Sequence, residues 1–279
     1  MPNAFERHRS LFREGEPVII VEPRGQRHYV HLRSGVRFHH KRMGHVAHSD
    51  IIGQVPGLQL TSDTGDRAVC LRPTLEDHIF KGLRRRTSVI HPKDLAPILI
   101  RGDVYPGASV LEAGAGSGAC SIFLLRHLGP HGVLTSYERR EEFAELARQN
   151  VEAFHRLYGG SGATHRIVNG DVYEAVAERD QDLVLLDLAE PHLALPPCIE
   201  ALRPGGVLLC WLPTVTQVYR LALELEDDPR WTGVETTETL ERNWKVEENA
   251  MRPHHRMIAH TGFWIRARKI VPPEWNQET

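Results

Sequence analysis

The sequence predicts an α/β fold in which a doubly wound, mostly parallel sheet follows a small N-terminal β-rich domain. From about residue 108 onward, strand-like and helix-like apolar patterns alternate along the chain. Two strand-like segments, VLLDL and VLLCWL, are continuously apolar, which is typical of strands that are covered on both faces. The first 72 residues instead contain short strand-like segments separated by turn residues.

Composition restricts the class of protein. A chain of 279 residues can bury a sizeable core, and 41% hydrophobic with 25% charged residues is the composition of an ordinary globular protein. No apolar run approaches the roughly 18 residues that span a bilayer. The N-terminal segment is charged and lacks the apolar core of a secretory signal. We therefore expect a cytoplasmic protein whose four widely spaced cysteines are reduced.

Charge alone does not indicate a partner. The net charge of −2 gives no support to nucleic-acid binding. Basic residues nevertheless gather in four clusters, which lie at residues 39–42, 84–86, 252–256 and 266–269. Such clusters usually form solvated surface. They could also converge on one cleft, and the sequence leaves both interpretations open.

The N-terminal domain, residues 1–72, is expected to contain two hairpins. Residues 17–22 and 27–32 flank the turn PRGQ, and residues 58–63 and 67–72 flank TGD. After Arg72 the pattern changes, and Thr74 is expected to cap a helix that runs through LEDHIFKGLRRR. This change places the start of the second domain, residues 73–279.

The second domain is expected to alternate strands and helices. Its strand-like segments are ASVLEAG, GVLTSYE, THRIVNGDV, DLVLLDL and VLLCWLP, and its helix-like segments are ACSIFLLRHLG, residues 140–159 and TVTQVYRLALELEDD. The helix over residues 140–159 is expected to bury one stripe made of Phe143, Leu146, Ala147, Val151, Phe154 and Leu157. Two β-like segments, TLERNWKV and TGFWIRARKI, follow and suggest an antiparallel edge.

A glycine-rich loop is the strongest chemical signal. Gly114, Gly116 and Gly118 lie in VLEAGAGSGA, between a predicted strand and a predicted helix. Glycines let the backbone turn sharply and approach a ligand, and the helix N-terminus offers unpaired N–H groups. Because Ala119 also permits a GxGxxA pattern, the loop alone fits a dinucleotide, S-adenosylmethionine or a purely structural turn.

Carboxylates at successive strand ends favour S-adenosylmethionine. Glu112 precedes the glycines, Glu138 ends the next strand where it could accept hydrogen bonds from ribose hydroxyls, and Asp171 ends the third strand. Asp187 ends the fourth, where an open α/β sheet places its reactive groups. A carboxylate there could accept a hydrogen bond from the exocyclic amine of an adenine and stabilise charge that develops on the ring. The alternative interpretation of Asp187 is a helix cap.

With this order of motifs the chain looks like a class I methyltransferase with a Rossmann-like sheet. It resembles more specifically the tRNA (adenine-58-N1)-methyltransferase family, in its archaeal and bacterial homotetrameric branch. The resemblance covers most of the chain and is carried by RFHHKRMGHVAHSDIIG, LRPTLEDHIFKGLRRRTSVIHPKD, VLEAGAGSGA, SYERREEFAELARQNVE, DLAEP, LPTVTQVYR, LERNWKV and RPHHRMIAHTGFWIRARK.

The resemblance implies transfer of a methyl group from S-adenosylmethionine to N1 of an adenine in the T-loop of tRNA, by a homotetramer whose N-terminal domain assists tRNA binding and assembly. Asp187 and His91 would be catalytic. Residues implied at the substrate are His192, Arg252 and His255. Residues implied at the cofactor are Val89, Glu112, Gly114, Gly116, Ser117, Gly118, Ala119, Glu138, Asp171, Val172 and Asp187.

Histidines mark two departures from the family. The family usually has tyrosine at the position of His91 and an aromatic residue at the position of His192, and histidine offers less π surface for stacking on a base. The identity of the base and its position in tRNA therefore stay open. Four further histidines suggest a metal cluster at first sight, but they lack neighbouring cysteines or carboxylates at metal-site spacing, so we expect no metal; they are His39, His40, His45 and His48.

Three other functions are alternatives to this interpretation. The first is methyl transfer to another RNA base or to a protein side chain. The second is a non-catalytic, RNA-binding subunit of the same fold, which would usually lack the glycine loop and Asp187. The third is an NAD-dependent oxidoreductase, which would need a hydride-transfer dyad that the second half of the chain does not show.

Overall fold

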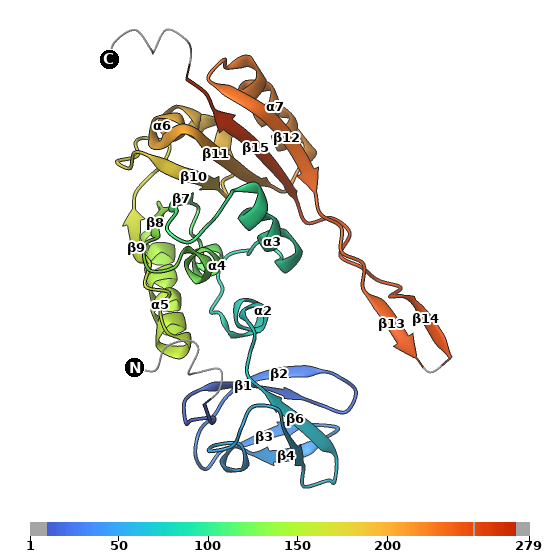
Figure 1. Cartoon of the computed structure of the whole chain (residues 1–279). Coiled ribbons are helices and arrows are strands. Elements are labelled where there is room, and N and C mark those ends of the chain that lie inside the picture. Colours follow the sequence, from blue (N-terminus) through green and yellow to red (C-terminus); the bar gives the residue numbers. More distant parts are fainter. Residues whose placement is uncertain (1–9, 248, 272–279) are drawn as a thin grey trace. The chain divides into compact units, whose positions relative to one another are not determined.

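The structure is a computed structural model, and it describes residues 10–247 and 249–271. The chain divides into two compact units (Figure 1). One unit comprises Met1–Arg84 and Glu152–Gly160, and the other comprises Arg85–Val151 and Ser161–Thr279. Within the described part of the chain, no helix is both long and apolar enough to cross a membrane. The same part contains four cysteines, all as free thiols.

The first unit is a β module. Its four-stranded sheet has the order β2-β1-β6-β5, and β3 pairs with β4 in a separate ribbon. Both predicted hairpins are confirmed, since β1 pairs with β2 and β5 pairs with β6, each pair being antiparallel. The strand bounds are β1 Pro17–Val21, β2 Arg27–His31, β3 Arg37–His40, β4 Gly44–Ala47, β5 Leu58–Thr61 and β6 Arg67–Leu71.

Apolar side chains that alternate along these strands form the core of the module. Val18 and Ile20 of β1 are fully buried together with Leu32 and Met43. A period of two residues places one face of each strand toward this core. The short 3-10 helix η1, His48–Asp50, lies between β4 and β5 in the chain.

The helix expected after Thr74 is shorter than the sequence suggests. Thr74 does form a capping box with Asp77, and helix α2 spans Leu75–Asp77. A π-helical turn, η2 His78–Gly82, follows it, and the chain is extended at Leu83. A side-chain carbon at Gly82 would collide with the ring of Tyr29, so this turn lies directly against the β2 strand. The prediction that helix continues through the arginines at 84–86 is therefore wrong.

The second unit contains a seven-stranded sheet with the order β12-β15-β11-β10-β7-β8-β9. The five strands from β11 to β9 are parallel, and β15 and β12 add an antiparallel edge, visible beside β11 in Figure 1. This confirms the predicted sheet. The strand bounds are β7 Ser109–Ala113, β8 Val133–Glu138, β9 Thr164–Asn169, β10 Gln181–Leu186, β11 Leu202–Leu212, β12 Trp231–Glu238 and β15 Phe263–Lys269.

Helices connect the strands of this sheet. Their bounds are α3 Pro92–Arg101, α4 Ala119–Leu128, α5 Glu141–Tyr158, η3 Pro191–Ala194, α6 Leu195–Ala201 and α7 Val215–Asp227. The buried stripe of α5 differs in part from the expected one. Ala147, Val151 and Phe154 are buried as expected. Phe143, Leu146 and Leu157 are only half-buried, and Ala144 and Tyr158 are buried instead. The helical face is therefore rotated slightly from the one that apolar residues alone indicate.

Strand β12 and a two-stranded hairpin were not expected as such. The hairpin consists of β13 Trp244–Glu247 and β14 Ala250–Pro253, and it lies in the chain between β12 and β15. Strand β12 has the sequence WTGVETTE, in which most residues are polar and exposed, so it carries little hydrophobic signal. Its pairing with β15 is set by the tertiary structure.

Candidate active site

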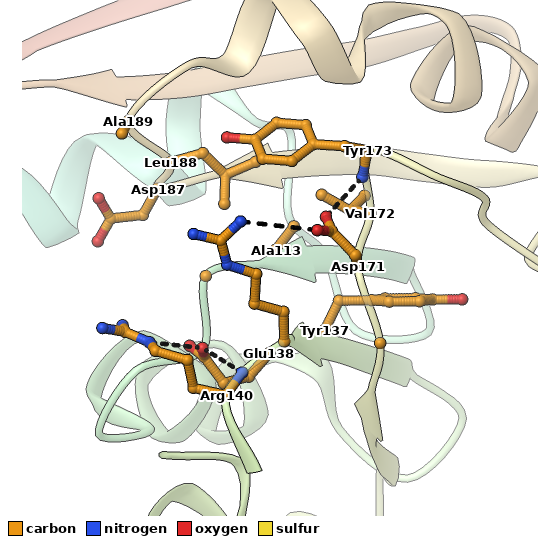
Figure 2. Close-up of a pocket in the computed structure, with 13 residues that line it drawn as sticks. Ala113, Tyr137, Glu138, Arg140, Asp171, Val172, Tyr173, Asp187, Leu188 and Ala189 are labelled. Carbon is orange, nitrogen blue, oxygen red and sulfur yellow. Dashed lines mark hydrogen bonds and ion pairs between the residues drawn. The ribbon is translucent and has the colours of Figure 1, made fainter. Parts of the chain in front are cut away.

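The carboxyl ends of four adjacent parallel strands meet at one edge of the sheet. Ala113 of β7 lies beside Tyr137 of β8 and Leu186 of β10, and Glu138 lies beside Asn169 of β9. The residues that follow these positions therefore share one edge, where open α/β sheets place their ligands. A pocket is found there, and its lining includes Gly114, Glu138, Asp171, Val172 and Asp187 (Figure 2).

The glycine loop forms one wall of this pocket. Gly114, Gly116 and Gly118 all have positive φ, at 91°, 53° and 77°. Gly114 donates its N–H to the carbonyl oxygen of Tyr137 at 3.0 Å, and Gly118 is the N-cap of α4. The loop thus turns from β7 into the helix through left-handed conformations that favour glycine.

Close packing adds a second reason for the glycines. A side-chain carbon at Gly114 would collide with the carbonyl oxygen of Asp187. At Gly116 it would lie 2.9 Å from Oγ1 of Thr87, and at Gly118 it would lie 3.2 Å from Cα of Ala147. The absence of a side chain at Gly114 therefore lets the backbone of Asp187, just after β10, approach the loop closely.

Glu138 has the fixed orientation that a ligand-binding carboxylate needs. It is 6% exposed, and its Oε2 accepts the N–H of Gly116 at 3.0 Å. Its Oε1 accepts the backbone N–H of Arg140 at 3.1 Å and the Nε–H of the same residue at 3.3 Å. Figure 2 shows this carboxylate beside Arg140 on the β8 side of the pocket.

Asp171 lies on the opposite side of the pocket from Glu138 in Figure 2. Its Oδ1 accepts the N–H of Tyr173 at 3.0 Å, which orients the carboxylate after β9. Nη1 of Arg139 lies 3.7 Å from its Oδ2. Glu138 and Asp171 are thus each paired with an arginine that follows β8.

Glu112 lies beneath the loop and is not among the residues that line the pocket. It is 2% exposed, and its Oε2 accepts the hydroxyls of Ser121 and Ser136, each at 2.6 Å. Oε1 is buried and has no hydrogen-bond partner among the described residues. Burial raises the pKa of Glu112, although these two hydroxyls oppose that effect.

Asp187 joins two parts of the pocket. It lines the cavity beside Glu138 and Asp171, and it also lines a second cavity with Val89, Ala119 and the glycine loop. Desolvation, followed by the charges of Glu112 and Glu138, raises the pKa of Asp187 to about 7. Because the side chain is exposed to water in the pocket, solvent screens these charges.

The second cavity is closed by the segment that precedes α3. Thr87, Ser88, Val89 and Ile90 line it, opposite Ser117 of the loop. The hydroxyls of Thr87 and Ser117 are 2.8 Å apart. This hydrogen bond ties the segment to the loop, so both walls of the cavity are held in place.

The turn after Asp187 is also held by side chains. Nε2 of Gln217 donates to the carbonyl oxygen of Ala189 at 2.9 Å, and the N–H of Glu190 donates to the hydroxyl of Tyr173 at 3.4 Å. Gln217 belongs to the LPTVTQVYR segment, whose Thr214 caps α7. This segment, one of those that carry the family resemblance, thus supports the turn that follows Asp187.

A buried ion pair fixes the start of α3. Nζ of Lys93 lies 2.8 Å from Oδ1 of Asp94 and donates to the carbonyl oxygen of Thr239 at 2.6 Å. Asp94 Oδ2 accepts the hydroxyl of Thr261 at 2.6 Å, and its carbonyl oxygen accepts Nε1–H of Trp264 at 3.0 Å. This network joins α3 to β15 and to the chain after β12.

Most of the residues that were predicted to bind the cofactor lie together in the structure. Nine line the two cavities: Val89, Gly114, Gly116, Ser117, Ala119, Glu138, Asp171, Val172 and Asp187. Glu112 and Gly118 support the loop from behind. The roles of all eleven in binding a cofactor stay predictions at this point.

His91, predicted to be catalytic, and the three residues predicted for the substrate are not among those that line the two cavities. His91 is the N-cap of α3, and its Nδ1 accepts the N–H of Lys93 at 3.4 Å. His192 lies in η3, shortly after the pocket-lining Ala189. Nη1 of Arg252 lies 2.6 Å from Nε2 of His255, at the β13–β14 hairpin. Their roles also stay predictions.

Sequence reasoning missed several pocket residues. Arg139 and Arg140 follow Glu138 directly, and Tyr173 follows the GDV segment. The basic pair next to a strand-end carboxylate is the signal that could have found the arginines. Cys120 also lines the second cavity, and burial raises the pKa of its thiol, which disfavours the nucleophilic thiolate form.

We predict that Gly114→Ala lowers the affinity for S-adenosylmethionine at least about tenfold, because the new methyl group pushes the end of β10 away from the loop. Isothermal titration calorimetry measures the effect. Gly107→Ala is the matched control: its φ is 102°, but the nearest atom, Cβ of His131, would lie 3.9 Å away. Equal affinities in both variants and the wild type would contradict the steric account.

Comparison with known proteins agrees with this geometry. The family model described as "tRNA methyltransferase complex GCD14 subunit" matches residues 69–268, and the model described as "TrmI-like N-terminal" matches residues 11–58. The chain is 31% identical over 253 residues to tRNA (adenine(58)-N(1))-methyltransferase TrmI of Thermus thermophilus, covering 91% of this chain and 96% of that protein.

Other relatives extend the comparison. The tRNA (adenine(57)-N(1)/adenine(58)-N(1))-methyltransferase TrmI of Methanocaldococcus jannaschii is 31% identical over 277 residues, covering 92% and 95% of the two chains. A SAM-dependent O-methyltransferase from Thermotoga maritima is 30% identical with a TM-score of 0.86, covering 94% and 96%. TrmI from Aquifex aeolicus is 28% identical with a TM-score of 0.83, covering 94% and 99%.

Both the sheet edge with its glycine loop and the family match over residues 69–268 lead to one conclusion. The chain belongs to the family of S-adenosylmethionine-dependent tRNA methyltransferases that includes the TrmI tRNA (adenine(58)-N(1))-methyltransferases.

Proposed function

We propose that this protein transfers the methyl group of S-adenosylmethionine to N1 of an adenine in tRNA, at position 58 in the T-loop. The observation that supports this most strongly is the continuous pocket from Asp171 through Glu138 to Asp187, closed by the glycine loop. The curated relatives with this activity cover nearly the whole chain. We further propose that the protein acts in the cytoplasm.

The pocket residues fit S-adenosylmethionine. Glu138 is oriented to accept hydrogen bonds from ribose hydroxyls, and Asp171 to accept from the adenine amine of the cofactor. Oε1 of Glu112 is a buried acceptor without a described partner, below the loop that would approach the amino-acid part. S-adenosylmethionine supplies an electrophilic methyl group on a positively charged sulfur. Three carboxyl groups close enough to influence one another suit such a cation.

Asp187 is proposed as the catalytic residue. Its carboxylate would accept a hydrogen bond from the exocyclic amine of the target adenine and hold N1 toward the methyl group. As the methyl group moves, positive charge leaves the cofactor and develops on the base, and the same carboxylate stabilises it there. N1 has a free lone pair, so this transfer requires neither a strong base nor a metal ion.

Basic residues beside the pocket suit a tRNA substrate. Arg85 and Arg86 are exposed, and they directly precede the pocket-lining segment that starts at Thr87. We assign phosphate contacts to them and to the Arg252–His255 pair. The charged side chains of the RARK cluster have partners within the protein instead. Nζ of Lys269 donates to the carbonyl oxygens of Ile199 in α6 and Leu202 in β11, Arg266 donates to Glu235, and Arg268 donates to the carbonyl oxygen of Gly205. The N-terminal domain is proposed to assist tRNA binding and assembly.

His91 and His192 are proposed to border the flipped adenine. His91 follows the pocket-lining Ile90, and His192 follows the turn that carries Asp187 and Ala189. An imidazole in either place can stack on a base and donate a hydrogen bond.

We predict that Asp187→Ala lowers the rate of methyl transfer roughly 100-fold or more, because the target adenine loses its positioning and charge-stabilising group. Single-turnover assays with saturating labelled S-adenosylmethionine and unmodified tRNA transcripts measure the rate, and nuclease digestion with mass spectrometry locates the product. Glu190→Gln, in the same turn but outside the pocket lining, should keep the wild-type rate. A wild-type rate in Asp187→Ala would contradict the proposed mechanism. If no tRNA yields a methylated product with the wild-type protein, the proposed function is wrong.

The raised pKa of Asp187 predicts that S-adenosylmethionine binds more weakly in acid. As the pH falls through this raised pKa, the carboxyl group takes up a proton in the free protein, whereas the cationic cofactor favours its ionised form. Affinity should therefore rise from pH 6 to pH 8, by at most about tenfold per pH unit, with protons released on binding. Calorimetry in two buffers of different ionisation enthalpy measures both effects. S-adenosylhomocysteine, which lacks the sulfonium charge, and the Asp187→Asn variant should show flatter profiles; a slope in Asp187→Asn equal to that of the wild type would contradict the assignment.

We also propose that the protein is a homotetramer assembled in part through the β13–β14 hairpin. Trp244, Val246 and Met251 are exposed by 52%, 73% and 67%. Trp244 and Val246 alternate onto one face, and Met251 pairs with Val246, so the three form one apolar surface. A lone two-stranded hairpin with such a face is marginally stable in water, and an exposed apolar patch of this kind marks an interaction site.

We predict that the double variant Val246→Asp, Met251→Glu dissociates into smaller species, because charges replace the apolar surface. Analytical ultracentrifugation measures the mass of the assembly. Lys245→Ala, on the opposite face of the hairpin, is the control and should leave the mass unchanged. A monomeric wild type, or a double variant that keeps the tetrameric mass, would overturn this interface.

A further inference from the structure

Three strands of the N-terminal β module carry apolar stripes that face its core. Val18 and Ile20 of β1 point into this core, and so does Leu32, with Val30 packed against it. Phe38 of β3 packs against the same core. Because side chains alternate between the two faces of a strand, each stripe continues at every second residue.

Each of these stripes ends in a side chain that can bind a metal ion. The stripe of β1 continues at Glu22, one residue after the strand ends, and the stripe of β2 continues at His28. The stripe of β3 continues from Phe38 to His40. His28 pairs with Ile20 across the hairpin, so Glu22 is its diagonal neighbour on the same face.

The three side chains converge. One ligand atom from each of Glu22, His28 and His40 lies within 4.8 Å of the other two. Oε2 of Glu22 is 3.0 Å from Nδ1 of His40, and the rings of His28 and His40 have centroids 4.7 Å apart. Glu22 is 5% exposed, which is unusual for a carboxylate without a fixed cation.

One ring nitrogen of each histidine in this cluster lacks a hydrogen-bond partner among the described residues. Nε2 of His28 and Nδ1 of His40 are both buried, and neither makes a hydrogen bond with a described residue. The short approach of His40 to Glu22 therefore brings two potential ligand atoms together without the angles of a hydrogen bond. Buried polar atoms of this kind require an explanation, and a bound cation supplies one.

We propose that Glu22, His28 and His40 bind a divalent transition-metal ion, with zinc the ion that the donor set suits. Two imidazoles and one carboxylate form a known type of three-ligand zinc site, in which a water molecule takes the fourth position. Zinc bonds of about 2.0–2.2 Å place tetrahedral ligands roughly 3.5 Å apart, so the cluster closes around the ion by small side-chain rotations. The ion would join β1, β2 and β3 at the end of the core and stabilise the module.

This site differs from the histidine cluster that the sequence suggests. His39 points to the other face of β3, where its ring lies 4.4 Å from that of His45, and His45 pairs with Asp63. His48 is buried and accepts the N–H of Arg33 at 3.0 Å. Among the four suggested histidines only His40 belongs to the proposed site. The proposal does not depend on the methyltransferase activity and departs from the expectation that no metal binds.

The test is zinc binding to the full, untagged chain. After treatment with a chelator and dialysis, titration with Zn²⁺ in competition with a zinc indicator should show one equivalent bound, and Zn²⁺ should raise the melting temperature. Glu22→Gln, His28→Gln and His40→Gln should each lower the affinity at least about tenfold. His39→Gln, adjacent to His40 but on the opposite face, should bind zinc as the wild type does.

The possible outcomes separate a metal site from an ion pair. The proposal would be overturned if the wild type bound no zinc, or if the three ligand variants bound zinc as tightly as the His39→Gln control. Either result would leave a His40–Glu22 ion pair. Circular dichroism checks that each variant is folded. Zinc K-edge absorption of the wild type provides a second measurement that needs no variant: it should show only nitrogen and oxygen ligands with scattering from two imidazoles, and scattering from sulfur or from no imidazole would refute the assignment.

Discussion

The placement of three carboxyl groups at one edge of the sheet is the constraint on which this active site depends. Glu112, Glu138 and Asp187 lie at the ends of adjacent strands, close enough for Asp187 to feel the charges of the other two. Hydrogen bonds stabilise Glu112 from two serines and Glu138 from the loop and Arg140. No described side chain neutralises Asp187 in this way. A cationic methyl donor, and then a base that becomes cationic, would relieve its repulsion during the reaction.

The parallel sheet and its glycine loop could be predicted from the sequence because their signals are local. Continuous apolar runs mark β10 and β11, and the three glycines of the loop each need positive φ or close packing. Carboxylates placed at strand ends share an edge whenever those strands are neighbours, so the order Glu138, Asp171, Asp187 already indicated one site. That order, with the family match, also removes the dinucleotide interpretation of the loop.

Features that depend on contacts distant in sequence could not be predicted. The π-helical turn that follows α2 ends at Gly82 in close contact with the ring of Tyr29, and no local propensity encodes that contact. Lys93 is held by the chain near residue 239, so its burial has no local signal. The proposed metal ligands come from β2, β3 and the residue after β1, with irregular spacing in the sequence. Of the histidines that stand out in the sequence, His39 and His45 pair across the β3–β4 ribbon, His40 points to its other face, and His48 lies in η1.

The most direct test of the account is a crystal structure of the protein with S-adenosylmethionine bound. The account predicts that the ribose hydroxyls donate to Glu138, that the adenine amine of the cofactor donates to Asp171, and that the methyl group points toward the space beside Asp187. A cofactor bound with its ribose away from Glu138, or with its methyl group turned away from Asp187, would contradict the assignment of the strand-end carboxylates.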